Sequence, residues 1–490
     1  MPAVQPRHAV VVGGSLAGMC VARALADHVE RVTVVDRDRF PDGPEVRGGV
    51  PQAHHLHVLV TAGQRALDRL FPGILDELHK AGAVPVEVPT DVLYLTATGW
   101  RQRFPATHRL IGASRELIDW TVYQRLSTDE RIRFLPAHEV VGLLPAAPRA
   151  ADAARIDDST PNDDSGGSGS GGSGSGGGGP AVGGVRLRPR GDAAGAETEL
   201  VADLVVDASG RGSRAGEWLT TLGYPAPEET RIDSRLGYAS RRYVLPDSAV
   251  GDWKNILIMP DPPRSGRGAV LYPIENDRWM LTLGGLGEDR PPTDAEEFLD
   301  YTRGLRSTII YDVISQGRPD SAIHGYLRTS NHRRHFETMR SWPLGFLVVG
   351  DAACCFNPVY GQGMSVAAQT AVALDEHLRA RPAGAPPLDH TAQVVAARCA
   401  SVAWLIATGA DSRLPTATTS TRPGLRDRLS HQYLSRASDV ANRDPYVCEV
   451  LTDVMHLVAP PTVLTRPKVM ARVLRGRPGP RLWTPPERPA

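Results

Sequence analysis

The sequence predicts an α/β fold in which a discontinuous domain with a parallel sheet is interleaved with a mainly antiparallel sheet domain and followed by a helical region. Apolar strands run into glycine-containing turns and helices near the N-terminus and again near residue 350. Between residues 231 and 338 the pattern changes to alternating segments with aromatic residues. We therefore assign residues 1–90, 106–230 and 339–380 to the first domain, 91–105 and 231–338 to the second, and 381–490 to the C-terminal region.

The first 36 residues have the order of a Rossmann βαβ unit. An apolar strand over 8–12 is followed by a turn, a helix expected over 19–28, and a strand over 31–35 that ends at Asp36. Glycines allow a tight turn and close helix packing, and the helix N-terminus offers N–H groups to a pyrophosphate. Asp36 stands where a carboxylate accepts a ribose hydroxyl. The residues predicted to bind a dinucleotide here are Gly13, Gly14, Ser15, Leu16, Ala17, Gly18, Asp36 and Arg37, with Ser15 at the usual second glycine.

Two later segments indicate that the dinucleotide is FAD. The strand 202–207 ends at Asp207 before a turn of small residues, and the strand 346–349 ends before Gly350 and Asp351. Asp351 can hold a ribityl hydroxyl, and a glycine-rich turn before a helix over 365–378 would aim backbone amides at an electron-rich ring system. The residues predicted to bind FAD in these segments are Asp207, Gly350, Asp351, Pro358, Gly361, Gln362, Gly363 and Met364.

Together the three segments resemble the p-hydroxybenzoate-hydroxylase-like FAD-dependent monooxygenases, whose FAD domain is a GR2-like Rossmann fold. The resemblance covers the chain to about residue 380. The segments 47–57, 113–115, 207–213 and 356–365 look like the actinobacterial polyether epoxidases of the lasalocid and monensin type, relatives of squalene epoxidase. The sequence departs from that family at His54, where arginine is usual, and at Gln362, where histidine is frequent. The resemblance implies that Arg47, Val50 and Arg115 lie against FAD, with one arginine near phosphate or ribityl oxygens and the other near the isoalloxazine.

The resemblance implies an enzyme that inserts one oxygen atom from O₂ into a hydrophobic, polyketide- or terpenoid-like substrate, by epoxidation or hydroxylation. NAD(P)H is the expected electron donor, used directly or through a separate reductase, because no second G-x-G-x-x-G motif precedes a helix. One alternative is a redox-neutral cyclase in which FAD shapes the pocket. Another is a carrier resembling the GDP-dissociation inhibitors, which binds a lipidated partner and no flavin. Asp351 and the turn over 361–364 argue against the carrier.

Histidines gather in the segment 54–57. A side chain with an ordinary pKa near ~6.5 can donate a proton at neutral pH, so His57 is our candidate for protonating the oxygen that leaves during O–O cleavage. His54, His55 and His57 could also suggest a metal site. No cysteine and no Glu-x-x-His motif accompanies them, so we predict no metal.

Composition limits the class of partner. Lys plus Arg and Asp plus Glu number 55 each, which gives no electrostatic reason to expect nucleic acid or an anionic membrane as a partner. No uninterrupted apolar run reaches the roughly 18 residues of a membrane span, and the N-terminus lacks a signal-peptide core, so we expect a cytoplasmic protein. The five cysteines lack C-x-x-C spacing and predict neither a disulfide framework nor a zinc site. We interpret Cys354 and Cys355 as packed apolar side chains.

The remaining segments complete the expected architecture. A Gly/Ser-rich surface loop over 157–180 separates strands over 139–144 and 182–188 that should pair as a ribbon. Helices are expected over 390–405, 425–441 and 446–458, either packing over the second domain or forming a dimer contact. The sequence is therefore consistent with a monomer and with a homodimer. The last dozen residues should be frayed.

Overall fold

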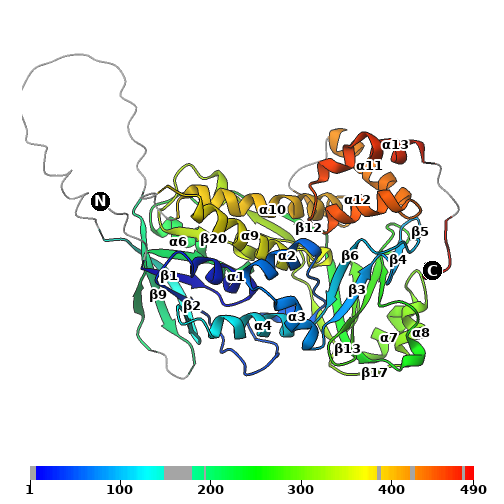
Figure 1. The fold of residues 1–490 in the computed structure, drawn as a ribbon, viewed down its shortest axis with the longest axis horizontal. Helices are drawn as coiled ribbons and strands as arrows, with labels where there is room; N and C mark the ends of the chain where they lie inside the picture. The colour runs from blue at the N-terminus through cyan, green and yellow to red at the C-terminus, as the bar shows by residue number, and fades with distance from the viewer. Residues whose placement is uncertain are drawn as a thin grey trace, which may run out of the picture.

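The computed structural model describes residues 7–147, 179–191, 195–382, 388–419, 425–476 and 481–489. It confirms the mixed α/β fold. In Figure 1 the parallel sheet and its helices occupy one half of the molecule, and the larger antiparallel sheet occupies the other. Most of the Gly/Ser-rich segment expected to form a loop over 157–180 lies outside the described residues.

A parallel sheet forms the centre of the first half. Its strands adjoin in the order β20-β11-β1-β2-β7, which places the first strand of the chain in the middle. These are β20 (Phe346–Val348), β11 (Leu204–Asp207), β1 (His8–Val12), β2 (Arg31–Val35) and β7 (Ile132–Leu135). Every residue of β1 is buried, as expected for a strand covered on both faces. The carboxyl ends of β1, β11 and β20 therefore adjoin at one edge, where the predicted FAD-binding turns begin.

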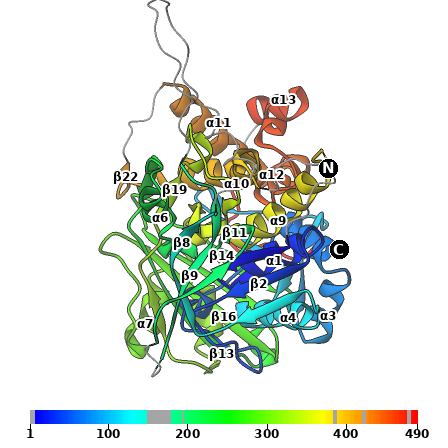
Figure 2. The same ribbon diagram turned by 90° about the vertical axis from the view of Figure 1, so that its left-hand side faces the viewer.

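Helices cover this sheet and bury its apolar side chains. Figure 2 shows α1 close to the strands, with α9 and α10 beyond it. The helices of this half are α1 (Leu16–Leu25), α2 (Thr61–Leu70), α3 (Ile74–Lys80), α4 (Arg115–Ser127), α6 (Ala215–Thr221), α9 (Gly363–Arg379) and α10 (His390–Asp411). The first helix begins three residues earlier than expected, because the turn at Gly13 and Gly14 brings Ser15 to the N-cap position. It ends at Leu25, ahead of the predicted end at residue 28.

The predicted ribbon of the first half is present and gains a third strand. β8 (His138–Pro145), β9 (Val182–Pro189) and β10 (Thr198–Val201) form an antiparallel sheet in the order β10-β9-β8. The small residues over 181–184 allow close backbone approach, and Gly184 has a φ of +148° where an added Cβ would meet the carbonyl of Leu200.

The second half is built on an eight-stranded, mainly antiparallel sheet among the described residues. Its path is β17-β13-β16-β15-β14-β4-β5, and β18 pairs with β13. The strands are β4 (Val92–Thr96), β5 (Gly99–Trp100), β13 (Leu236–Val244), β14 (Asn255–Ile258), β15 (Arg267–Ile274), β16 (Arg278–Leu286), β17 (Arg318–Pro319) and β18 (His324–Tyr326). Two short helices, α7 (Ala295–Arg303) and α8 (Ile309–Ile314), pack on its apolar core.

Two smaller sheets lie between or beside these halves. One has the order β21-β19-β12-β22, and its members are β12 (Glu229–Asp233), β19 (Asn331–Arg334), β21 (Cys354–Cys355) and β22 (Thr418–Thr419). The other pairs β3 (Val84–Val88) with β6 (His108–Gly112). The domain boundaries given above stay a prediction.

The C-terminal helices α11 (Leu425–Ala441), α12 (Pro445–Met455) and α13 (Pro467–Arg475) contact both halves. Asn442 donates from Nδ2 to the Thr96 hydroxyl in β4 at 2.7 Å, and the amide of Ala62 in α2 donates to the carbonyl of His456 at 3.2 Å. The helix α13 was not predicted, since a short amphipathic segment between prolines gives a weak signal. The prediction that the last dozen residues are frayed was wrong for Leu482, because its carbonyl accepts from the Trp100 amide at 2.9 Å.

One described helix, α10, is long and apolar enough to cross a membrane by length and composition, with a mean hydropathy of 1.3. It contains Arg398 and packs along α9. Ala392, Ala403 and Ala407 on one of its faces are completely buried. A core helix of this kind passes the same composition test, so the helix is weak evidence for a membrane span.

Candidate FAD and substrate site

The first turn has the geometry that its glycines predicted. Gly13 has a φ of +101°, and a Cβ placed there would come within 2.6 Å of the Ala208 carbonyl oxygen. A Cβ on Gly18 would collide with the Gly13 carbonyl. The first turn of α1 carries no acidic residue, which keeps its N–H groups suited to an anion. The turn therefore has the shape and charge to hold a pyrophosphate.

Asp36 is buried beside this turn. Its Oδ2 accepts from the Gly14 amide at 2.6 Å, and its Oδ1 accepts from the Asp38 amide at 2.8 Å. Arg37 next to it is exposed, and its Nη2 lies 3.4 Å from the Gly49 carbonyl. Of the other predicted turn residues, Leu16 has its side chain in the core, so only its backbone is available to a ligand.

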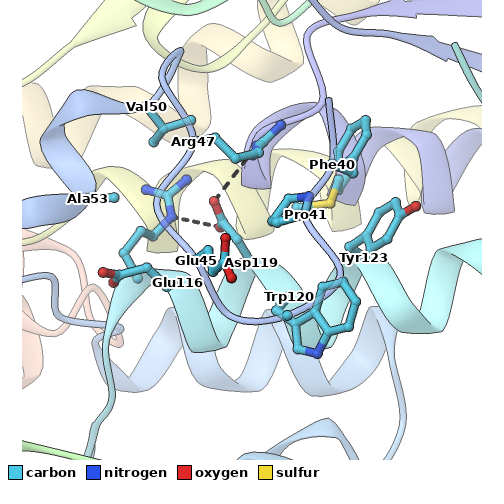
Figure 3. A pocket seen from close by; sticks show the side chains of 13 residues that line it. Phe40, Pro41, Glu45, Arg47, Val50, Ala53, Glu116, Asp119, Trp120 and Tyr123 are labelled. Atoms are coloured by element: carbon cyan, nitrogen blue, oxygen red, sulfur yellow. Dashed lines mark hydrogen bonds and ion pairs between the residues drawn. The ribbon is translucent and has the colours of Figure 1, made fainter. Parts of the chain in front are cut away.

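Two buried arginines line a pocket of about 370 Å³ next to the turn. Arg47 donates to the Gly14 carbonyl at 2.8 Å, and its guanidinium carbon lies 4.8 Å from the centre of the Phe40 ring. Arg115, the first residue of α4, donates from Nε to Asp119 at 2.7 Å. The Asp119 carboxylate, labelled in Figure 3, lies 2.7 Å from the Nε of Arg115 and 4.0 Å from the Nη2 of Arg47. Val50 lines the same pocket.

Asp207 is held within the turn that follows β11. It is completely buried, its Oδ1 accepts from the Ser209 amide at 2.9 Å, and its Oδ2 accepts from the Ser213 hydroxyl at 2.6 Å. Asp207 therefore stabilises this turn, and its contact with a cofactor stays a prediction.

The third segment lines a larger pocket with an empty volume of about 780 Å³, its open mouth included. Gly350 and Asp351 follow β20, while Gly361 has a φ of +63° and redirects the chain into α9. Burial raises the pKa of Asp351, although Arg211 and Arg115 act in the opposite direction. The predicted residues that line this pocket are His57, Arg115, Asp351, Pro358, Gly361, Gln362, Gly363 and Met364. Arg115 lines both pockets, which are therefore adjacent.

His57 is neutral in this pocket. Burial, followed by the charge of Arg115, lowers its pKa to about 3. Its Nδ1 lies 3.0 Å from the His55 carbonyl oxygen and must donate to it, because a carbonyl only accepts. We expected an ordinary pKa for His57, and this was wrong. The imidazole is uncharged near pH 7 and therefore carries no additional proton to donate. The Nε2 of His57 is left as a hydrogen-bond acceptor.

The neighbouring histidines hold the segment 54–57 against the second sheet. His54 stacks on His324 of β18 with ring centroids 3.7 Å apart. The Nδ1 of His55 lies 2.8 Å from the Ser240 hydroxyl in β13, and burial lowers the pKa of His55 to about 4. The three histidines therefore each contact a different group of the protein.

Gln362 connects the turn that precedes α9 with the C-terminal region. Its side chain is 1% exposed, and its Nε2 donates to the Met455 carbonyl at the end of α12 at 3.0 Å. Because that carbonyl only accepts, the orientation of the Gln362 amide is fixed.

Other pocket residues were not singled out from the sequence. Arg211, Tyr238 and Tyr326 come from three distant segments and line the larger pocket. Arg211 stands in the turn after β11, where its position between two glycines was the one available signal. The two tyrosines belong to β13 and β18, and only the pairing of those strands brings them to the pocket.

Comparison with known proteins agrees with this geometry. Residues 182–401 match the family model described as FAD binding domain. The chain is 30% identical over 384 residues to Protein Rv3254 of Mycobacterium tuberculosis (strain ATCC 25618 / H37Rv), a match that covers 76% of this chain and 73% of the relative. The chain belongs to the same family as that protein.

Solved structures share the fold. p-Nitrophenol 4-monooxygenase PnpA from Pseudomonas putida DLL-E4 superposes with a TM-score of 0.57 and 16% identity, over 93% of this chain and 99% of that one. The probable FAD-dependent monooxygenase pqsL from Pseudomonas aeruginosa superposes with a TM-score of 0.54 and 17% identity, over 83% of this chain and 94% of that one. At these identities the likeness concerns the fold.

Proposed function

We propose that this protein uses FAD and O₂ to insert one oxygen atom into a hydrophobic, polyketide- or terpenoid-like substrate, with alkene epoxidation as the main reaction and hydroxylation as the closest variant. The observation that carries the proposal is the pocket of about 780 Å³ that opens directly on Asp351 and the turn over 358–364. A pocket at this place would bring the flavin ring and the reacting part of a substrate together. The resemblance of segments 47–57 and 356–365 to polyether epoxidases supports the choice of substrate class.

The residues present fit FAD. A Cβ at Gly13, Gly18 or Gly350 would collide with neighbouring protein atoms, so these glycines shape the turns that the cofactor would approach. Arg47 and Arg115 would hold its phosphate or ribityl oxygens, and Asp351 would accept from a ribityl hydroxyl. Gly361 to Met364 would direct backbone amides toward the ring system. When bound, FAD supplies the redox chemistry that activates O₂.

This chain's own residues would orient the substrate and exclude water. The wall of the pocket includes the apolar or aromatic side chains of Leu56, Val58, Tyr326, Phe356 and Met364, and it also includes the charged side chains of Arg115, Arg211 and Asp351. The apolar part would contact a hydrocarbon chain, and the charged groups would contact the cofactor. His57 is an acceptor here and would bind a hydroxyl or N–H group of a ligand through Nε2.

The electron donor belongs to the same proposal. We propose NAD(P)H, acting directly at the flavin site or through a partner reductase. The support is the sequence, which contains one Rossmann-type glycine turn and therefore offers no second domain for a resident nicotinamide nucleotide.

The test begins with the absorbance spectrum of the purified protein, followed by anaerobic addition of NADPH and then by air with polyene test compounds. We expect a flavin spectrum, bleaching by NADPH or by an added flavin reductase with NADPH, and an oxygenated product only when reductant and O₂ are both supplied. Conversion of substrate without reductant or O₂ would contradict oxygen insertion and identify a redox-neutral cyclase.

A further inference from the structure

The turn over 357–363, here called the flavin-site turn, begins at Asn357. This residue is completely buried and fully hydrogen-bonded. Its backbone amide donates to the Asn331 Oδ1 at 2.8 Å, and its Oδ1 accepts from the Tyr238 hydroxyl at 2.8 Å. The same Oδ1 caps the short helical turn after it by accepting from the Val359 amide at 3.2 Å. Asn357 therefore links the pocket wall at Tyr238 with the first residues of the turn.

The last residue of α10, Asp411, supplies the carboxylate of this network, although it lies 54 residues beyond Asn357 in the chain. Its Oδ2 accepts from the Nδ2 of Asn357 at 2.9 Å and from the Nδ2 of Asn331 at 2.7 Å. Its Oδ1 accepts from the Tyr360 hydroxyl at 2.7 Å. Asp411 is 1% exposed, so these three donors replace the water that a carboxylate would otherwise hold.

The carboxylate also decides which way its neighbours point. Because an ionised carboxylate only accepts, both asparagine side chains must turn their NH₂ groups toward Asp411 and their oxygens away from it. The Asn357 oxygen is thereby presented to Tyr238, whose hydroxyl must donate to it. The proton of Tyr238 is committed to this bond and is not available to a ligand in the pocket.

We propose that Asp411 is a positioning residue of the flavin site, which sets the conformation of the turn over 357–363 and the hydrogen-bond polarity of Tyr238 through the Asn357 amide. Asp411 lines neither of the two pockets described above, and it acts through Asn331, Asn357 and Tyr360. The last residue of α10 thus contributes to the site without lining it. This inference rests on the proposed function insofar as the turn is where the flavin binds.

Two substitutions of Asp411 distinguish the effect of hydrogen-bond polarity from the effect of losing the side chain. Asp411→Ala removes the carboxylate acceptors of the Asn331 and Asn357 NH₂ groups and of the Tyr360 hydroxyl. Asp411→Asn keeps one oxygen for the two asparagine NH₂ groups, and its own NH₂ can donate to Tyr360, because a hydroxyl accepts as well as donates. The matched control is Asp389→Ala, which removes the N-cap carboxylate at the other end of α10, where it accepts from the Thr391 amide at 2.9 Å.

Each protein is measured for its dissociation constant for FAD, for the visible circular dichroism of the bound flavin and for the thermal midpoint of the apoprotein. We expect Asp411→Ala to weaken FAD binding about tenfold, the equivalent of ~1.4 kcal/mol, and to change the circular dichroism. Asp411→Asn should stay within about threefold of wild type, as expected when the hydrogen-bond geometry survives. Asp389→Ala should lower the thermal midpoint and leave the other two quantities unchanged.

Wild-type affinity and circular dichroism in folded Asp411→Ala would overturn the inference, as would the same flavin changes in Asp389→Ala. If Asp411→Ala does not fold, Tyr360→Phe decides, since it removes one donor and keeps the ring: altered flavin circular dichroism supports the inference and an unaltered spectrum overturns it. A wild-type protein that binds no FAD contradicts the proposed function itself, which distinguishes the two failures.

Discussion

His57 donates its Nδ1–H to the carbonyl oxygen of His55 at 3.0 Å, and this bond fixes one neutral tautomer in the wall of the larger pocket. A charged imidazole there would have to lose solvent and lie near Arg115, which is why its pKa falls to about 3. The residue therefore acts as a hydrogen-bond acceptor over the whole range in which histidines usually titrate.

This tautomer gives the first prediction. His57→Ala should raise the fraction of reducing equivalents released as hydrogen peroxide, because the acceptor that orients the ligand is lost. The ratio of wild-type to variant kcat/KM should stay constant between about pH 5 and 8, since a group with a pKa near 3 does not titrate there. Stopped-flow and peroxide assays across this range check both points. A ratio that changes through about pH 6.5, the ordinary histidine pKa, would restore the proton-donor role.

Arg47 should not be replaceable by lysine. Its guanidinium donates to the Gly14 carbonyl, lies 3.5 Å from an Asp36 oxygen and packs over the Phe40 ring. An ammonium is a single point charge that cannot make these contacts together. We expect Arg47→Lys to weaken FAD binding by about tenfold, measured by fluorescence titration. The exposed Arg39→Lys is the matched control, and equal effects of both substitutions would contradict this role.

Gly13 is required by the backbone of the first turn, and Gly48 provides a control for its replacement. Gly13→Ala places a Cβ at a φ of +101° and within 2.6 Å of the Ala208 carbonyl oxygen. Strain of this kind costs of order 1–3 kcal/mol, so the variant should lose thermal stability and purify with little flavin. Gly48→Ala meets no atom within 4 Å and should retain both properties. Full flavin content in Gly13→Ala would show that the turn can relax.

Acid should destabilise the protein partly through His456. Burial, then the nearby His108, lowers its pKa from 6.5 to about 3. Between these values the unfolded chain binds a proton that the native state does not, so the free energy of unfolding falls as the pH is lowered through this window. His456→Gln should reduce that slope by up to ~1.4 kcal/mol per pH unit. Urea unfolding at several pH values measures it, and identical slopes in both proteins would refute the assignment.

Cys355 should be chemically inert in the native protein. Burial raises the pKa of its thiol to about 12, and its Sγ donates to the Asp351 carbonyl at 3.0 Å. Thiolates are the reactive form, so iodoacetamide at neutral pH should leave Cys355 unmodified until the protein unfolds. Peptide mass spectrometry after brief labelling checks this. Rapid native labelling would contradict the interpretation of Cys354 and Cys355 as packed apolar side chains.

Local sequence signals predicted the parts of the site that single turns create. The turn at Gly13 and the position of Asp351 after β20 follow from strand, glycine and helix within about twenty residues, and the family model over 182–401 agrees with the FAD reading. The position of Asp207 after a strand does not by itself reveal that the Ser213 hydroxyl donates to its carboxylate.

The rest of the site depends on contacts between distant segments. Asp411 ends an apolar helix and has no motif around it, so its meeting with Asn331 and Asn357 could not be read from the chain. The pKa of His57 likewise depends on burial and on Arg115 of another element. Tyr238 and Tyr326 reach the pocket only through the pairing of β13 with β18.

The most direct test of the central claim is a single turnover with isotopically labelled O₂, in which the reduced flavoprotein is mixed with a polyene substrate and the product is analysed by mass spectrometry. The proposed oxygen insertion predicts that each new epoxide or hydroxyl group carries one labelled oxygen atom, with the second atom recovered in water. Product oxygen that comes entirely from unlabelled water, or product formed at the same rate without O₂, would contradict a monooxygenase.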